Sequence, residues 1–244
     1  MVINNKVAFI PIPKNASWSV EDTCIDYGFD LRYPNTLWQN SIKYNTKNTQ
    51  KHLHSTVDII VDTFGTNLDY VCIIRDSTDR FISAWKYFIN AMVVEVNEEL
   101  ANSIKNIDNK FVMKFIIDNY SDFCNAYNSF ETRKNLLGKL VTEIGIAEQY
   151  AINEDFKKRY AMHIYTFVSQ YQWILDNRVN VKQFKFDNLS EFEHYMSEKL
   201  DVDFKLIHKN QNKLDYCAVS KTEELTKFVN EYIDGVIKTT KSIL

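Results

Sequence analysis

Two buried, strand-like runs, each followed by a short turn and a helical pattern, most constrain what this chain can fold into. The first run covers Lys6 to Ile12 and leads to helical spacing over Trp18 to Tyr27. The second run, Asp69 to Ile74 (DYVCII), leads to Asp79 to Asn90, where apolar side chains recur on one side. Repeated strand-loop-helix units are typical of a parallel sheet covered by helices. We therefore expect an α/β fold.

The rest of the chain continues this pattern. Val179 to Phe186 is predicted to be a further strand, and Ser190 to Leu200 the helix that follows it. Ala161 to Asn177 is predicted to be one long amphipathic helix. Asn97 to Tyr160 is predicted to be mostly helical and to form an insertion on the substrate side. No internal repeat interrupts the chain. The sequence predicts a single, helix-rich α/β domain over residues 1–244 with a parallel sheet flanked by helices.

Composition removes several classes of protein. With 45% hydrophobic and 14% aromatic residues, the chain can fill a sizeable core. Only 5 glycines and 3 prolines occur, which argues against a β-sandwich rich in tight turns. A formal net charge of −3 gives no reason to expect nucleic acid or an anionic membrane as partner. Any anion site must therefore be local.

The spacing of the cysteines and the length of the apolar runs argue against further classes of protein. The 4 cysteines form no CxxC pair, so zinc-ribbon and redox-motif functions have no support. No apolar run approaches the roughly 20 residues that a membrane-spanning helix needs. Met1 to Lys6 lacks the basic and apolar regions of a secretory signal, so we expect a cytoplasmic protein without a membrane span.

The loop after the first strand has the features of an anion site. A strand that ends in a short loop and feeds a helix brings backbone N–H groups and the positive end of a helix dipole to one point. In PIPKNASWS, Lys14 adds a mobile cation, Ser17 and Ser19 add hydroxyl donors, and the small Ala16 allows close approach. The Walker pattern is absent, which disfavours an ordinary nucleoside triphosphatase. A solvated surface lysine is the alternative interpretation.

A second anion segment follows the second strand. IIRDSTDRFISAW places Arg75 at a strand end and Ser83 one helical turn beyond Arg80, so that a guanidinium and a hydroxyl are expected to converge on one phosphate. Asp76 and Asp79 are expected to orient the arginines. The alternative is a surface helix that carries ion pairs.

Together, IPKNASWS and IIRDSTDRFISAW resemble the two nucleotide-binding segments of the sulfotransferases that use 3′-phosphoadenosine 5′-phosphosulfate (PAPS), in the carbohydrate branch whose motifs run IPKTAGTS and VRDPYERFLSAY. The resemblance implies a P-loop-like α/β fold and PAPS as the donor, with no metal. It implies that Arg75 and Ser83 hold the 3′-phosphate. The residues that it places around the 5′-phosphosulfate are Lys14, Asn15, Ala16, Ser17, Trp18 and Ser19.

The resemblance has departures and weaker extensions. Trp18 stands where the family has Thr, and Ser77 replaces a turn-setting Pro. Further along, TFVSQYQWI at Thr166 to Ile174 is similar to the family's HFxPQxxxL segment, and Gln170 matches its Gln. FKFDNL and HKNQNK are similar to later family segments, so the resemblance covers nearly the whole chain.

An alcohol acceptor needs a base near neutral pH, which points to histidine. In the family a His in the loop before the predicted helix of Ser55 to Phe64 commonly has this role, and KHLHST holds two candidates. His54 fits the HxT spacing and is preferred over His52, although Lys51 and His52 also resemble a KH variant. An unperturbed histidine predicts a rate that rises through a pH of about 6.5.

The sequence thus predicts transfer of a sulfuryl group from PAPS to a hydroxyl of a glycan or another small polar acceptor. Two alternatives stay open: a P-loop-like small-molecule kinase, and a nucleotide-binding module without catalysis. Lys14 is the expected group that neutralises the departing phosphate, with His54 or His52 as the base. The sequence defines neither the acceptor nor the oligomeric state.

Overall fold

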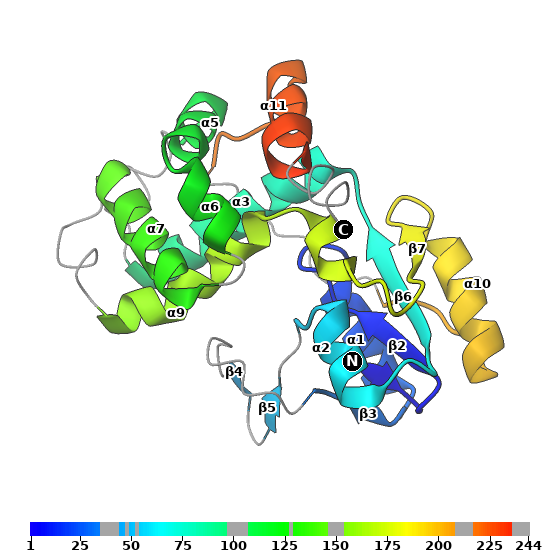
Figure 1. The fold of residues 1–244 in the computed structure, drawn as a ribbon. Helices are drawn as coiled ribbons and strands as arrows, with labels where there is room; N and C mark the ends of the chain where they lie inside the picture. The colour runs from blue at the N-terminus through cyan, green and yellow to red at the C-terminus, as the bar shows by residue number, and fades with distance from the viewer. Residues whose placement is uncertain are drawn as a thin grey trace. The chain divides into compact units, whose positions relative to one another are not determined.

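The chain divides into two compact units, each with its own core (Figure 1). The computed structural model describes residues 1–34, 44–46, 49–51, 54–96, 107–126, 129–145, 154–207 and 217–235. Unit 1 comprises Met1–Asp76 and Gln170–Gln211, and unit 2 comprises Ser77–Ser169 and Asn212–Leu244. One domain over residues 1–244 stays a prediction.

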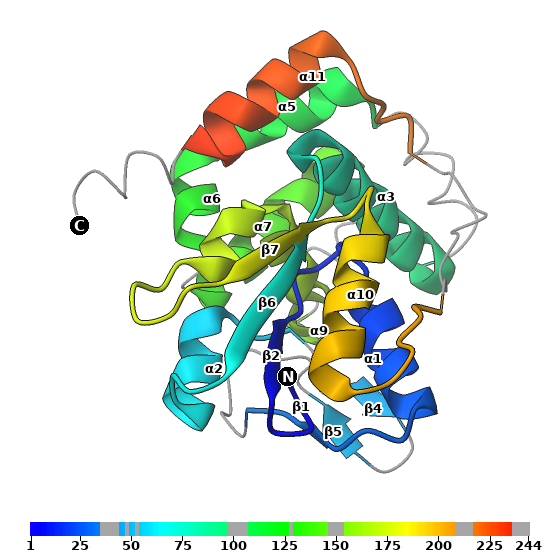
Figure 2. The same ribbon diagram turned by 90° about the vertical axis from the view of Figure 1, so that its right-hand side faces the viewer.

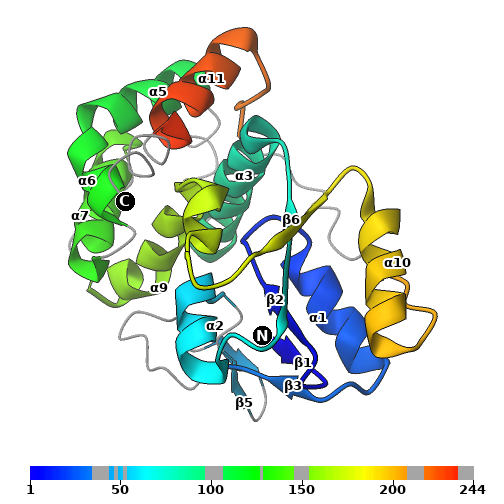
Figure 3. The ribbon, with the colours of Figure 1, turned by 45° about the vertical axis from the view of Figure 1, so that its right-hand side comes forward.

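Unit 1 is a mixed five-stranded sheet with helices on both faces. Its elements are β1 (Val2–Ile3), β2 (Val7–Ile10), α1 (Ser17–Asp26), β3 (Leu31–Arg32), β4 (Tyr44–Thr46), β5 (Thr49–Lys51), α2 (Val57–Phe64), β6 (Asp69–Ile74), the 3-10 helix η2 (Gln170–Ile174), β7 (Lys182–Lys185) and α10 (Leu189–Leu200). The strand order is β3-β1-β2-β6-β7, and β4 and β5 form a separate antiparallel pair. Figures 2 and 3 show α1 and α10 on one face of the sheet and α2 on the other.

The centre of the sheet is parallel and its β1 edge is antiparallel. β2 pairs with β6, and β6 with β7, in parallel, whereas β1 runs antiparallel to β2 and β3. All four residues of β2 (VAFI) are buried, as expected of a strand covered on both faces. The α/β class, the helices around the sheet and the three parallel strands are therefore confirmed. The sheet as a whole is mixed, because β1 is antiparallel to both of its neighbours. The sequence did not predict β1 and β3, which have 2 residues each and leave no readable apolar pattern.

Alternate strand residues divide the core of unit 1. Phe9, Val71 and Ile73 belong to one cluster with the apolar faces of α1 and α10. Within it, the rings of Phe9 and Phe192 lie 5.8 Å apart. The period of two along each strand sends the intervening residues to the opposite face. This packing fixes the carboxyl ends of β2 and β6 beside each other.

Unit 2 is helical in the residues that the structure describes. Its elements are α3 (Ser77–Val96), α5 (Asn109–Asp118), α6 (Tyr120–Ala126), α7 (Phe130–Glu143), α9 (Glu154–Ile164), the 3-10 helix η1 (Tyr165–Phe167), α11 (Glu223–Phe228) and the π-helical turn η3 (Val229–Ile233). Trp85 and Phe167 stack in its core with ring centroids 4.4 Å apart. Figure 3 shows α11 beside α5, where Asn109 Nδ2 donates to Ser220 O at 2.9 Å. Helices α5, α6, α7 and α9 confirm the helical pattern predicted between Asn97 and Tyr160.

The long helix predicted from Ala161 to Asn177 is wrong. The α-helix ends at Ile164 and is followed by the short 3-10 helices η1 and η2. The buried guanidinium of Arg80 supplies the reason, because it donates to Thr166 O at 2.9 Å and to Val168 O. These carbonyls bond to a side chain in place of helix amides. Arg80 is thus a core residue of unit 2 and does not lie on the surface.

No helix among the described residues has the length and apolar character that crossing a membrane requires.

Candidate anion-binding site

The loop between β2 and α1 has an unusual backbone for a segment without glycine. Lys14 has φ 68° and Ala16 has φ 60°, in the left-handed region that non-glycine residues seldom occupy. Asn15 N donates to Ile12 O at 3.2 Å, and Ser17 Oγ donates to the same oxygen at 2.6 Å. These bonds fold the loop back on the end of the strand. Backbone conformations of this kind cluster at ligand sites, where the surrounding structure holds them in place.

The N-terminus of α1 is arranged to meet an anion. Ala16 is the N-cap and supplies no side-chain acceptor, and the first turn carries no acidic residue. Within the helix, Val20 N donates to Ala16 O at 3.0 Å; the amides of the turn before such a bond have no intrahelical acceptor. A left-handed residue followed by a helical one also turns successive N–H groups toward one point. The backbone therefore favours negative charge here.

Two cationic side chains accompany this helix terminus. Burial, together with the smaller effect of the nearby Arg75 charge, lowers the pKa of Lys14 to about 8. Arg75 follows the carboxyl end of β6, and its guanidinium lies 4.7 Å from the centroid of the Phe186 ring. Two cations that repel each other in a partly buried place are stabilised by an anion bound between or beside them. Lys14 is partly buried, which differs from the solvated surface lysine of the alternative interpretation.

Asn15 has partners within the protein, and the nucleotide contact that the resemblance implied for it stays a prediction. Its side chain is fully buried, and its Nδ2 donates to Ile73 O at 2.9 Å and to Gln170 Oε1 at 2.8 Å. Gln170 in turn accepts from Arg75 N at 3.0 Å and donates from Nε2 to Arg75 O at 2.6 Å. Asn15 and Gln170 therefore connect the Lys14 loop to the end of β6. The sequence offered Gln170 only as a match to a family segment, without a role.

The remaining loop residues divide between backbone support and exposure. The single hydroxyl hydrogen of Ser17 is directed to Ile12 O, so in this arrangement Ser17 closes the loop. Ser19 is buried and its carbonyl accepts from Thr23 Oγ1 at 2.6 Å. Trp18 is 39% exposed. Their predicted contacts with a 5′-phosphosulfate stay predictions.

Ser83 lies on α3 in unit 2 and is half-buried, whereas Arg75 belongs to unit 1. The convergence of these two residues on one phosphate stays a prediction. The start of α3 carries an ion pair, as the alternative interpretation of this segment expected, since Lys221 Nζ lies 3.1 Å from Asp79 Oδ2.

His54 is held with a defined tautomer in unit 1. Its Nδ1 lies 2.8 Å from Pro11 O, and because a carbonyl only accepts, Nδ1 carries the proton and Nε2 is the basic nitrogen. Its ring meets that of Trp173 edge-on at 6.2 Å. Burial lowers the pKa of His54 to about 4; the bond to Pro11 opposes this shift, and the charge of Lys14 adds to it. His54 is therefore neutral near pH 7, and the expected titration near 6.5 does not apply to it.

His52, the other candidate base, lies outside the described residues.

Anion affinity is expected to fall as pH rises through about 8, because the lowered pKa of Lys14 removes its charge there. Sulfate is a suitable probe, since its charge is constant in this range. We expect affinity measured by NMR titration to drop by up to about tenfold per pH unit between about pH 8 and 10, and Lys14→Ala to abolish the pH dependence. Equal affinity of the unaltered protein at both ends of this range would exclude Lys14 as the titrating ligand.

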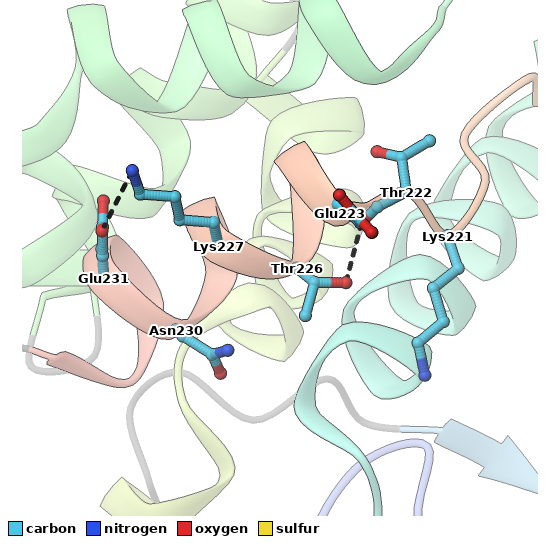
Figure 4. Close-up of a pocket in the computed structure, with 7 residues that line it drawn as sticks. All are labelled: Lys221, Thr222, Glu223, Thr226, Lys227, Asn230 and Glu231. Atoms are coloured by element: carbon cyan, nitrogen blue, oxygen red, sulfur yellow. Dashed lines mark hydrogen bonds and ion pairs between the residues drawn. The ribbon is translucent and has the colours of Figure 1, made fainter.

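A pocket in unit 2 is less suited to chemistry. Figure 4 shows it along α11 and η3, lined by residues from Lys221 to Glu231. Lys227 Nζ lies 3.9 Å from Glu231 Oε1, and Thr226 Oγ1 donates to Thr222 O at 2.8 Å. Some of the charged and hydroxyl groups that line this pocket thus interact with neighbours on the same helical stretch. None of the predicted site residues lines the pocket. Among the described residues, no group of three or more His, Cys, Asp or Glu side chains is placed to hold a metal ion.

Comparisons with known proteins return no match: no protein-family model, curated protein or solved structure is similar to the chain. The geometry and charge of the site are therefore the basis for a proposed function. Its defining features are a left-handed loop, a helix N-terminus and two cations at the carboxyl ends of parallel strands.

Proposed function

We propose that the protein is a sulfotransferase that moves a sulfuryl group from PAPS to a hydroxyl of a glycan or another small polar acceptor. One observation carries the proposal: Lys14 and Arg75 are close enough for the charge of Arg75 to lower the pKa of Lys14, at the N-terminus of α1. In open α/β sheets, ligands bind beside the carboxyl ends of the strands, where both residues lie. The loop sequence IPKNASWS favours a P-loop-like phosphate site among the possible anion sites.

The proposed roles follow from charge and position. Lys14, with the backbone of the first turn of α1, binds the 5′-phosphosulfate, and Arg75 binds the 3′-phosphate. A nucleotide with both groups brings negative charge to both cations, which raises the pKa of Lys14 and keeps its ammonium protonated. The same charge raises the pKa of His54 above its value of about 4 in the free protein.

These groups account for each bond, electron pair and proton in the proposed transfer step. The acceptor oxygen attacks sulfur in line with the leaving oxygen, a new S–O bond forms, and the S–O bond to the 5′-phosphate breaks. The electron pair stays on the departing phosphate oxygen, where the Lys14 ammonium neutralises it. The acceptor proton passes to Nε2 of His54, the nitrogen that the bond to Pro11 leaves basic. No metal takes part in the proposed step.

Arg75→Ala is expected to weaken binding of 3′-phosphoadenosine 5′-phosphate by about 1.5 to 3 kcal/mol, the usual contribution of a charge-assisted contact. Adenosine 5′-phosphosulfate, which lacks the 3′-phosphate, should be nearly insensitive to the Arg75 change in the same calorimetric assay. Arg178, an exposed arginine paired with Asp176 and Asp62, is the matched control.

An equal loss of affinity for both nucleotides would show that Arg75 does not bind the 3′-phosphate.

The activity itself is tested by transfer of label from sulfur-labelled PAPS to a panel of polysaccharides and small alcohols, in the presence of a chelator. We expect a labelled acceptor with the unaltered protein and almost none with Lys14→Ala. Tight PAPS binding without transfer to any acceptor or to water would instead support a nucleotide-binding module without catalysis.

A further inference from the structure

Two side-chain amides take the place of strand partners at the carboxyl end of β6. The pairing of β6 with β2 ends at Cys72 opposite Ile10, and on the other side Phe186 N donates to Ile74 O at 2.7 Å. The remaining backbone groups of Ile73 in β6, and of Arg75 directly after it, form hydrogen bonds with the side chains of Asn15 and Gln170. Asn15 Nδ2 donates to Ile73 O, and the Gln170 amide bonds to both N and O of Arg75. The strand end is thus held by side chains, which leaves the loop after β2 free to turn into α1.

Gln170 is the common point of these contacts. Its Oε1 accepts from Asn15 Nδ2 at 2.8 Å and from Arg75 N at 3.0 Å, and it is 1% exposed. The orientation of each amide is fixed, because only an NH₂ group can donate to the carbonyls of Ile73 and Arg75. A change in the position of the Lys14 loop therefore moves the same oxygen that holds the backbone of Arg75.

We propose that Gln170 is a positioning residue that fixes Arg75 relative to the Lys14 loop, so that the two anionic ends of one nucleotide bind together. This inference rests on the proposed function. Gln170 itself does not touch the nucleotide. A ligand with two charged groups gains affinity from the second group only when both subsites keep the spacing of the ligand. Without Gln170, each subsite persists but their spacing is no longer fixed.

The test compares one ligand that uses both subsites with two that each use one. The ligand that uses both subsites is 3′-phosphoadenosine 5′-phosphate, which is adenosine 3′,5′-bisphosphate. The other two are adenosine 5′-monophosphate and adenosine 3′-monophosphate. Gln170→Met keeps the size of the side chain and removes its hydrogen bonds. We expect it to weaken the bisphosphate about 10- to 100-fold and each monophosphate less than about threefold.

Gln172→Met is the matched control. Gln172 lies two residues further along η2, and its Oε1 is buried without a hydrogen-bond partner among the described residues. This variant should leave all three affinities unchanged. Asn15→Ala removes a contact of Gln170 from the opposite side and keeps those with Arg75. It should show the same selective loss of the bisphosphate, to a smaller extent, and it decides the question if Gln170→Met does not fold.

The outcomes separate the two proposals. If the unaltered protein prefers the bisphosphate and the variants weaken all three ligands by one factor, or none, Gln170 is not a positioning residue while the proposed function stands. If the unaltered protein binds the bisphosphate no better than the monophosphates, the proposed function fails and this inference fails with it.

Discussion

Replacing Lys14 by alanine is expected to lower the rate of sulfuryl transfer by about 100-fold or more. The ammonium meets charge that develops on the departing phosphate, so its loss raises the barrier more than it weakens donor binding. The protein should stay folded, because the lowered pKa means that the folded state disfavours the charged form of Lys14 below about pH 8. Initial rates with labelled PAPS and thermal unfolding of the same preparation measure both effects.

Lys6 provides the control for this change. It is an exposed lysine at the opposite end of β2, so Lys6→Ala should keep both rate and stability. Near-normal turnover of Lys14→Ala would exclude Lys14 from the chemical step.

Replacing His54 by alanine is expected to remove most of the activity, by about 100-fold or more, with little change in donor affinity. The reason is geometric: the bond from Nδ1 to Pro11 O leaves Nε2 as the proton acceptor, and no other nitrogen of the ring can serve. His52→Ala should lose less. His194, exposed on α10 and 3.4 Å from Glu198, is the control histidine. Steady-state rates and calorimetric titration of the three variants separate catalysis from binding.

The pH profile gives this prediction a second test. The pKa of His54 in the free protein is about 4, so kcat/KM should be level from about pH 5 to 8 and fall below, as His54 becomes protonated. His54→Ala should lose the acid limb. If both histidine variants keep normal rates with the limb intact, neither is the base, and Lys51 or a carboxylate takes that role.

The three parallel strands were predictable because their signal is local. Buried parallel strands consist of continuous apolar residues, so DYVCII predicted β6 with the observed bounds, Asp69–Ile74. The break after α9 was not predictable, since it depends on Arg80, which bonds to carbonyls 86 and 88 residues away. Helical periodicity carries no trace of a side chain supplied by another helix.

The proximity of Lys14 and Arg75 was predictable for a similar reason. Residue types and their place after two strands identified Lys14 and Arg75, and the structure brings their charges together. The role of Asn15 depends on a bond to Gln170, 155 residues further along the chain. The pKa of His54 depends on burial, which spacing alone does not report. Residue roles and pKa values that depend on contacts between distant segments are visible only in the structure.

The most direct test of the account is a calorimetric titration of the unaltered protein with 3′-phosphoadenosine 5′-phosphate, in the presence of a chelator and against ATP with Mg²⁺. We expect tight, metal-independent binding of the bisphosphate, weakened by both Lys14→Ala and Arg75→Ala. Binding of ATP with Mg²⁺ in preference to the bisphosphate would indicate a kinase, and no binding of either nucleotide would contradict the assignment of Lys14 and Arg75 to a nucleotide site.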